Sequence, residues 1–148
     1  MTNWANKGKE ATAAIPLVKK DKADYGKKHK GFVESFTPKS YKTGSFGVEI
    51  KYTVEGLERP VYENVVLTTL SDTGTFTPTK YGDNSLKRRL QAFGLSSAAI
   101  NTFPTPRTPK DAGNEAYNFK GTPVVVYITQ ESYMGKAQNR VKAVFPQD

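Results

Sequence analysis

Aromatic side chains stand beside cations in three turn-rich stretches of the sequence. The residues concerned are Lys39, Tyr41 and Lys42, then Lys80 and Tyr81, then Tyr133, Lys136 and Arg140. A flat ring can accept a nucleobase by stacking, which contributes about 1–3 kcal/mol per base, and a neighbouring cation can neutralise a backbone phosphate. These residue types together indicate binding of an unpaired polynucleotide without strong preference for its sequence.

Two further cations are candidates for the same surface. Lys51 lies on the polar side of an alternating strand pattern, and Arg88 lies on the outer face of an expected helix. Each candidate also has a purely structural interpretation. Tyr41 and Tyr81 could cap the ends of a barrel with a solvated hydroxyl, and Arg88 could belong to an ordinary solvated helix face. Tyr52 alternates with core residues, so we expect it to be buried.

The residue types give little support to catalysis. His29 is the sole histidine, it stands among lysines, and the chain contains no cysteine. A lone histidine in a basic run is usually solvated. The carboxylates are scattered without the spacing of a metal site, and the common Gly-rich phosphate-loop motifs do not occur. We therefore expect no enzyme, no metal and no cofactor.

The chain is strongly basic. Its 148 residues carry 22 Lys and Arg against 14 Asp and Glu, which gives a formal net charge of +8. Such a balance favours polyanionic partners, nucleic acid above all, although a merely soluble basic protein would share it. No apolar run approaches the roughly 20 residues of a membrane span, and the N-terminus shows no apolar signal core. We expect a cytoplasmic protein with no membrane partner.

The length fits one folded domain preceded by a basic arm. Residues 1–30 hold eight lysines, and the large apolar residues of the arm are Trp4 and those of the segment Ile15-Pro16-Leu17-Val18. We expect an arm over residues 1–29, which could dock through these apolar residues, and a domain over residues 30–148. The arm could attract phosphates or serve only as a solvated tail.

The stretch 46–54 organises the expected sheet. Its apolar residues alternate with polar or small ones, which places the apolar set on one buried face of a strand. Further strands are expected at residues 31–37, 61–70, 122–130 and 139–145. The core candidates of the first and third strands are Phe32 and Phe36, then Val61, Val65, Val66, Leu67 and Leu70.

One short helix interrupts the series of strands. Residues 84–85 offer an N-cap, Leu86, Leu90 and Phe93 recur at helical spacing, and Gly94 suits the left-handed residue that ends a helix. Ser96 or Ser97 could cap one further helical turn through residue 100. The helix therefore falls between the third and fourth expected strands.

This order predicts an all-β protein, a five-stranded Greek-key barrel of the OB type with its helix between strands three and four. A β-sandwich with one helical excursion is the rival architecture. In an OB fold the ligand lies on strands two and three, between the loops that join strands one to two and four to five. Here those loops are residues 38–44 and 131–138, whereas residues 71–83 and 102–118 are expected to be irregular connections.

Four pieces of the sequence carry a resemblance to a known family. They are Phe46-Gly-Val-Glu-Ile-Lys-Tyr-Thr-Val-Glu-Gly, Leu86-Lys-Arg-Arg-Leu-Gln-Ala-Phe-Gly, Phe119-Lys-Gly-Thr-Pro-Val-Val-Val and Gly135-Lys-Ala-Gln-Asn-Arg-Val. In order and spacing, over about residues 30–146, the chain resembles the phage-encoded OB-fold single-stranded DNA-binding proteins. Such proteins commonly end in an acidic tail that recruits replication partners, and residues 145–148 do not have that character.

The resemblance implies a non-enzymatic protein that coats single-stranded DNA during phage replication or recombination, in the host-cell cytoplasm. Phage replication or recombination proteins are then possible partners, and a homodimer is compatible with the sequence. Three other functions stay open: an RNA-binding OB-fold protein, a β-rich structural or assembly protein with no nucleic-acid role, and an enzyme as the last choice.

Overall fold

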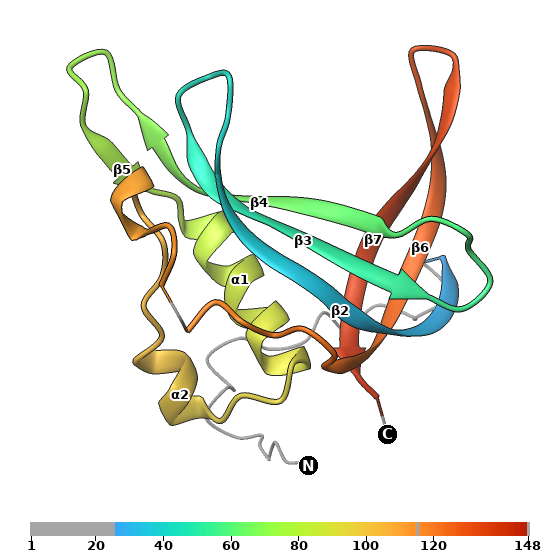
Figure 1. Cartoon of the computed structure of the whole chain (residues 1–148). Coiled ribbons are helices and arrows are strands. Elements are labelled where there is room, and N and C mark those ends of the chain that lie inside the picture. The colour runs from blue at the N-terminus through green and yellow to red at the C-terminus, as the bar shows by residue number, and fades with distance from the viewer. Residues whose placement is uncertain (1–25, 115, 148) are drawn as a thin grey trace.

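The computed structural model of the chain describes residues 26–114 and 116–147, with all their side chains except that of Tyr133. One strongly curved antiparallel sheet wraps around a helix (Figure 1). The strands are β2 (Lys27–Ser40), β3 (Phe46–Val54), β4 (Val61–Leu70), β5 (Phe76–Pro78), β6 (Pro123–Tyr133) and β7 (Lys136–Pro146). The helices are α1 (Lys80–Ala92), α2 (Ser97–Asn101) and the short 3₁₀ helix η3 (Pro109–Asp111). Of the expected arm, residues 1–29, the part up to residue 25 lies outside the described residues.

The expectation of a mostly β protein is confirmed, but the sheet has six strands rather than five. Its order is β5-β4-β3-β2-β6-β7. The additional strand, β5, lies in the stretch 71–83 that the sequence predicted to be a loop, and it pairs only with residues 68–70 of β4. Because β4 and β7 are not hydrogen-bonded neighbours, the described sheet is open along that seam.

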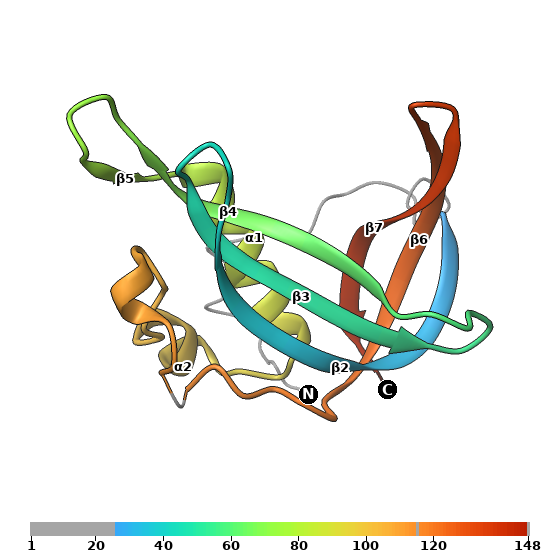
Figure 2. The same cartoon turned by 45° about the horizontal axis from the view of Figure 1, so that its top comes forward.

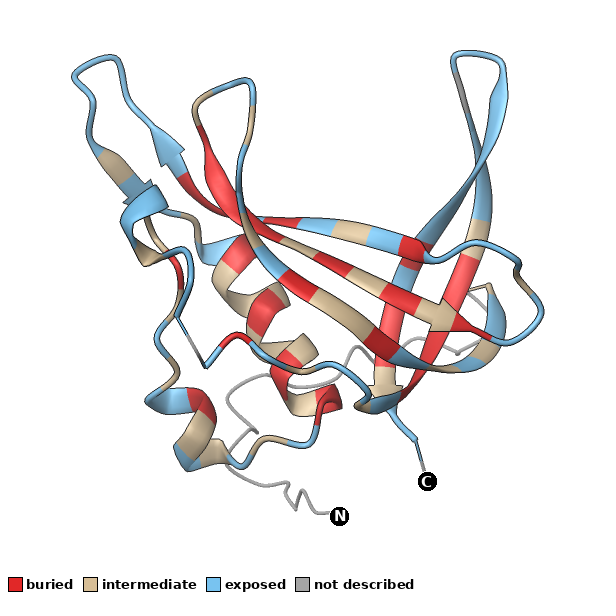
Figure 3. Cartoon of the chain, in the orientation of Figure 1, coloured by how far each residue is buried: buried red, intermediate tan, exposed pale blue. Residues whose placement is uncertain are grey.

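The alternating pattern of β3 is confirmed. Phe46, Val48, Ile50, Tyr52 and Val54 are all buried, whereas the polar residues between them are only half-buried. Figure 3 shows the buried residues recurring at intervals along the strands of the sheet and along α1. Burial of this apolar face is the main favourable contribution to folding, at about 25 cal/mol per Å² of apolar surface.

The prediction of burial is wrong for three of the expected core residues. Phe32, Val66 and Leu70 are exposed, by 42%, 37% and 40% respectively. Phe32 and Val66 lie on the outer face because residues in a strand alternate between the two faces. A buried threonine, Thr68, occupies the core instead, and its hydroxyl donates to the backbone oxygen of Arg107 at 2.8 Å.

The helix α1 begins about one and a half turns earlier than the sequence predicts. Its N-cap is Thr79, whose hydroxyl accepts the backbone N–H of Gly82, and not residues 84–85. The sequence does not indicate this start, because the first turn contains Gly82 and glycine disfavours a helix. Gly94 ends the helix with a φ of +93°, and Ser96 caps α2, both as expected.

The hairpin strands are also longer than the sequence predicted. β2 covers Lys27–Ser40, so the expected loop 38–44 is shortened, and the expected loop 131–138 is almost entirely strand. Only Met134 and Gly135 turn the chain between β6 and β7. Both have positive φ, at 51° and 79°, which is the backbone that a two-residue type I′ turn requires.

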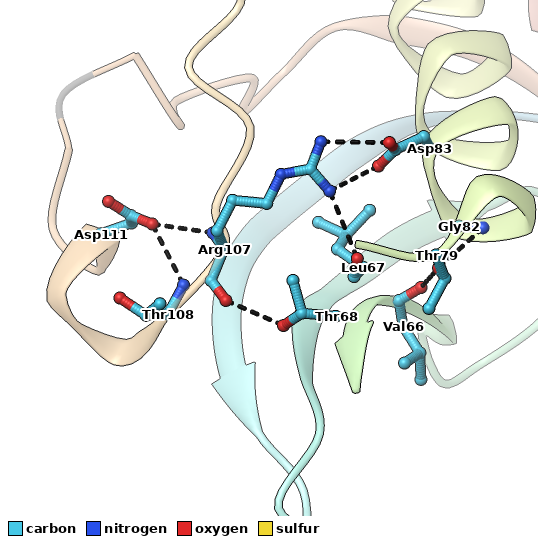
Figure 4. A network of polar contacts seen from close by, with 9 residues as sticks. All are labelled: Val66, Leu67, Thr68, Thr79, Gly82, Asp83, Arg107, Thr108 and Asp111. Atoms are coloured by element: carbon cyan, nitrogen blue, oxygen red, sulfur yellow. Dashed lines mark hydrogen bonds and ion pairs between the residues drawn. The ribbon is translucent and has the colours of Figure 1, made fainter. Parts of the chain in front are cut away.

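A polar clamp fixes α1 and the long loop after α2 to the sheet (Figure 4). Arg107 donates to both carboxylate oxygens of Asp83, at 2.7 and 3.1 Å, and to the backbone oxygen of Leu67 at 3.3 Å. The carboxylate of Asp111 accepts the backbone N–H groups of Arg107 and Thr108. Bidentate pairing of this kind sets geometry as well as energy, so the start of α1 is held against β4.

Gly82→Ala should destabilise the protein by about 1–3 kcal/mol, the usual range for overpacking. A Cβ atom at Gly82 would lie 1.9 Å from the backbone oxygen of Val66 and 2.4 Å from the hydroxyl of Thr79. The substitution must therefore push α1 away from β4. Ser85→Ala on the same helix is the matched control, and urea unfolding should show a change within about 0.5 kcal/mol there. Equal stability of the two variants would contradict this contact.

Candidate nucleic-acid interface

A groove of about 1240 Å³ lies between β4 and β7, where the sheet is open. Its lining comes from residues 56–66, from α1 between Tyr81 and Arg89, and from the hairpin of β6 and β7. β5 pairs only with residues 68–70, so it does not cover the first half of β4. Figure 2 shows β4 running across the sheet and the β6–β7 hairpin rising at one end of it, and residues of both elements line the groove.

Two exposed aromatic rings line this groove. Tyr62 on β4 is 56% exposed, and Tyr81 in the first turn of α1 is 82% exposed. Sequence reasoning named Tyr81 and missed Tyr62. The missed signal is strand alternation, because Tyr62 follows Val61, which is buried, and must therefore point to the opposite face.

Cations accompany the rings along the groove. Arg59 is exposed before β4, and Arg140 and Lys142 are exposed on β7. Both β7 cations are close to the carboxylate of Glu131, with N–O distances of 3.7 and 3.3 Å. Exposed pairs of this kind contribute only about 0–1 kcal/mol. A phosphate group can therefore replace Glu131 as the partner of these cations at little cost.

The floor of the groove is a buried ion pair between Glu63 and Arg89. Arg89 donates to both oxygens of the Glu63 carboxylate at 2.7 Å, and the Tyr52 hydroxyl donates to the same carboxylate at 2.6 Å. Burial alone lowers the pKa of Arg89, but the charge and hydrogen bonds of Glu63 raise it above its ordinary value. Burial, followed by the charge of Glu63, holds the pKa of Tyr52 well above its ordinary value. The arrangement joins α1 to β3 and β4 and keeps Arg89 charged.

Four of the residues predicted from the sequence lie outside the groove, on or beside the outer face of β2 and β3. Lys51 is opposite Tyr62 in the β3–β4 register and so lies next to the groove. Lys39 pairs with Glu49 at 3.1 Å and lies 5.8 Å from the centre of the Tyr41 ring. Lys42 is exposed in the turn that follows.

Tyr41 is held in place rather than presented to solvent. It is half-buried, and its hydroxyl donates to the side-chain oxygen of Asn64 at 2.8 Å and weakly to the backbone oxygen of Val48 at 3.3 Å. These contacts favour the structural interpretation of Tyr41 as a residue that fixes the β2–β3 turn against β4. The Lys39 ammonium nevertheless lies over the Tyr41 ring, so the two side chains share one surface.

The remaining predicted residues are spread around the groove. Arg140 lies in it, Lys80 precedes Tyr81 and is exposed, and Lys136 is exposed at the start of β7. Arg88 is half-buried, and its Nε has no hydrogen-bond partner among the described residues. The side chain of Tyr133 is outside the described part of the chain. Tyr81 and Arg140 thus line the same groove, and Tyr41 adjoins it through its hydrogen bond to Asn64, which also lines the groove.

The titration of Tyr41 gives a testable dependence of stability on pH. Burial, followed by the charge of Glu49, raises the pKa of Tyr41 to about 12. An unfolded chain loses this proton near pH 10, so the folded state binds more protons between about pH 10 and 12 and stability falls as pH rises there. Tyr41→Phe should lose less stability across that window in urea unfolding. An equally steep loss in both proteins would contradict the burial of this hydroxyl.

The structure offers no assembled metal site within residues 26–114 and 116–147, where no group of three or more His, Asp and Glu side chains could hold an ion. His29 is half-buried, and its Nδ1 donates to the backbone oxygen of Glu55 at 2.8 Å. None of the described helices is long and apolar enough to cross a membrane.

Comparisons with known proteins add no assignment. No protein-family model matches the chain, and a search of curated proteins gives no significant match. Function must therefore be inferred from the groove and its residues.

Proposed function

We propose that the protein binds single-stranded DNA in the groove between β4 and β7. The observation that carries the proposal is the pair of exposed rings, Tyr62 and Tyr81, in a groove that also presents Arg59, Arg140 and Lys142. Single-strand binding without sequence preference needs rings for the bases and cations for the backbone, and the groove supplies both. Its volume of about 1240 Å³ exceeds the roughly 300–1,000 Å³ of small-molecule pockets and suits a polymer that passes through.

The strand order supports an OB-type assignment. β2, β3 and β4 form a meander, α1 follows, and β6 pairs with β2 on one side and with β7 on the other. This is the connectivity expected of a partly open OB barrel, in which oligonucleotides lie across the second and third strands. Those strands correspond to β3 and β4 here, and the groove runs along β4 and is flanked by the β6–β7 hairpin.

Contacts that do not depend on base identity suit a protein that coats single-stranded DNA. Stacking and phosphate neutralisation accept any base, so such a groove binds exposed strands wherever they occur. Together with the resemblance to phage single-stranded DNA-binding proteins, this supports a role in phage DNA replication or recombination. Proteins of those pathways in the host cytoplasm are the proposed partners.

The salt dependence of binding tests the electrostatic part of the proposal. Fluorescence anisotropy of labelled dT oligomers, titrated with the protein over a salt series, gives the slope of log K against log salt concentration. If Arg59, Arg140 and Lys142 each neutralise one phosphate, the slope should be about −2, because each contributes about −0.7 on single strands.

Removal of one groove cation supplies the matched comparison. Arg140→Ala should reduce the magnitude of the slope by about 0.7, whereas Lys110→Ala, an exposed lysine of η3 outside the groove, should leave it unchanged. Oligo-U measured in parallel reports any preference for RNA, since a protein that reads the 2′-hydroxyl binds it more tightly. Absence of binding at low salt, or equal slopes in the two variants, would refute the proposed path.

A further inference from the structure

The turn that joins β6 to β7 holds an apolar side chain on an unfavourable backbone. Met134 is 85% exposed, and among the described residues it is the one non-glycine residue with a positive φ, at 51°. The left-handed conformation is unfavourable for most side chains and is adopted readily by glycine and, less so, by asparagine and aspartate. Asn-Gly is the usual sequence of such a turn, so the fold alone does not account for a methionine at this position.

The end of this hairpin stands away from the core. Every described side chain from residue 130 to residue 140 is exposed, on both strands of the hairpin. Figure 1 shows the hairpin of β6 and β7 projecting beyond the body of the fold. An apolar side chain at such a tip adds nothing to the core. Because an unfavourable backbone conformation often marks a functional position, Met134 is a candidate for contact with another molecule.

The charges of the hairpin indicate the kind of molecule. Within residues 129–142 the cations are Lys136, Arg140 and Lys142, and the one carboxylate is Glu131. All four of these side chains are exposed. The hairpin therefore attracts a polyanion, and it repels a second copy of a chain whose formal net charge is +8. A nucleic acid is the polyanion that also offers flat apolar surfaces to a methionine side chain.

The groove between β4 and β7 extends along this hairpin almost to its tip. Ser132 on β6 and Gln138 on β7 both line the groove. Met134 is two residues beyond Ser132, which at about 3.3 Å per residue places it within about 7 Å of the groove lining. A strand that leaves the groove at this end therefore has its next bases within reach of the Met134 side chain.

We propose that Met134 packs against a nucleobase of single-stranded DNA where the strand leaves the groove. The methionine side chain is flexible and fits irregular apolar surfaces, and its sulfur makes favourable contacts with aromatic rings. Methionine is also one of the apolar side chains that DNA-binding proteins insert between bases. The inference rests on the proposed function, because the base belongs to the strand bound in the groove. It adds a contact at the tip of the hairpin to those made by Tyr62 and Tyr81.

Met134→Asn tests the contact without disturbing the turn. Asparagine suits the left-handed backbone, so the midpoint of urea unfolding should not fall. Affinity for a labelled dT oligomer of about 16 nucleotides, measured by fluorescence anisotropy, should fall at least about fivefold. Equal affinity of the variant and the wild type would overturn the Met134 contact and leave the groove proposal standing. If the wild type itself bound no dT oligomer, the proposed function would fail and this contact with it.

Two controls separate the apolar contact from a general change at the tip. Met134→Leu keeps an apolar side chain of similar volume and should bind within about twofold of the wild type. A dT oligomer of about four nucleotides is too short to fill the groove and reach the tip, so it should bind Met134→Asn and the wild type alike. An equal loss of affinity in the Asn and Leu variants would overturn the contact. Self-association of the wild type that Met134→Asn abolishes, with DNA affinity unchanged, would show that the tip binds a second copy instead.

Discussion

Replacing Tyr62 and Tyr81 together by alanine should abolish most of the affinity for dT oligomers. If each ring stacks on one base, the double variant loses about 2–6 kcal/mol of binding free energy, at 1–3 kcal/mol per base. At 1.4 kcal/mol per factor of ten, this is a loss of at least about 30-fold in Kd. Both side chains are exposed, by 56% and 82%, so the fold should survive the change. Fluorescence titration of labelled oligomers at low salt measures the effect.

Two controls separate stacking from a general disturbance of the surface. Tyr62→Phe with Tyr81→Phe keeps both rings and should retain affinity within a few-fold. Phe32→Ala removes a ring that is 42% exposed but does not line the groove, and it should bind as the wild type does. Wild-type affinity in the double alanine variant, with normal circular dichroism, would exclude these rings as the stacking platform.

Glu63→Ala should produce the largest loss of stability. The substitution leaves the guanidinium of Arg89, a side chain only 12% exposed, without its counter-charge. It also removes the carboxylate that accepts the hydrogen bond of the Tyr52 hydroxyl. Breaking a buried ion pair in this way typically costs about 3–5 kcal/mol, because an uncompensated charge stays buried. The free energy of unfolding in urea measures the loss.

The surface pair of Lys39 and Glu49 is the matched comparison. Its two side chains are 46% and 21% exposed, so Glu49→Ala should cost less than about 1 kcal/mol. The double variant Glu63→Leu with Arg89→Met should recover much of the stability, since apolar residues of similar size often replace a buried pair without penalty. If Glu63→Ala and Glu49→Ala destabilised the protein equally, Glu63 and Arg89 would not form a buried pair in solution.

The sheet could be predicted well where one face of a strand is buried. The period-two pattern of β3 assigns Tyr52 and its apolar neighbours to the core correctly, because a single slip in register would expose the whole set. In β4 the hydrophobicity of Val66 predicts a core residue, but alternation with its buried neighbours Val65 and Leu67 places it on the outer face. The position of a residue in the alternation, and not its hydrophobicity, therefore decides which face of the strand it occupies.

The short strand β5 and the start of α1 could not be predicted from local pattern. β5 is three residues long, Phe76–Pro78, and pairs with the end of β4 in a local hairpin. A strand of this length is too short to show a period-two pattern, so its sequence resembles that of a loop. The N-cap at Thr79 precedes a first turn that contains Gly82, and this glycine is required by close contact with β4 and not by helix propensity.

Only part of the candidate site can be predicted from local sequence. Tyr81 and Arg140 could be recognised because each is a chemistry-bearing residue next to turn signals, and both line the groove. Tyr62 and Lys142 come from regular strands, and their place in the groove depends on the seam between β4 and β7, which no local stretch encodes. For Tyr41 the sequence leaves a stacking role and a structural role open, and the hydrogen bond from its hydroxyl to Asn64, 23 positions further along the chain, favours the structural role.

Photo-crosslinking of an oligo-dT that carries 5-iododeoxyuridine tests the proposed path most directly, because this base crosslinks to aromatic side chains that stack on it. Digestion and mass spectrometry then identify the linked peptides. The account predicts crosslinks at Tyr62 and Tyr81, which competition with unlabelled dT should suppress. Crosslinks confined to rings outside the groove, such as Phe32, in a protein that binds the oligomer tightly would contradict it.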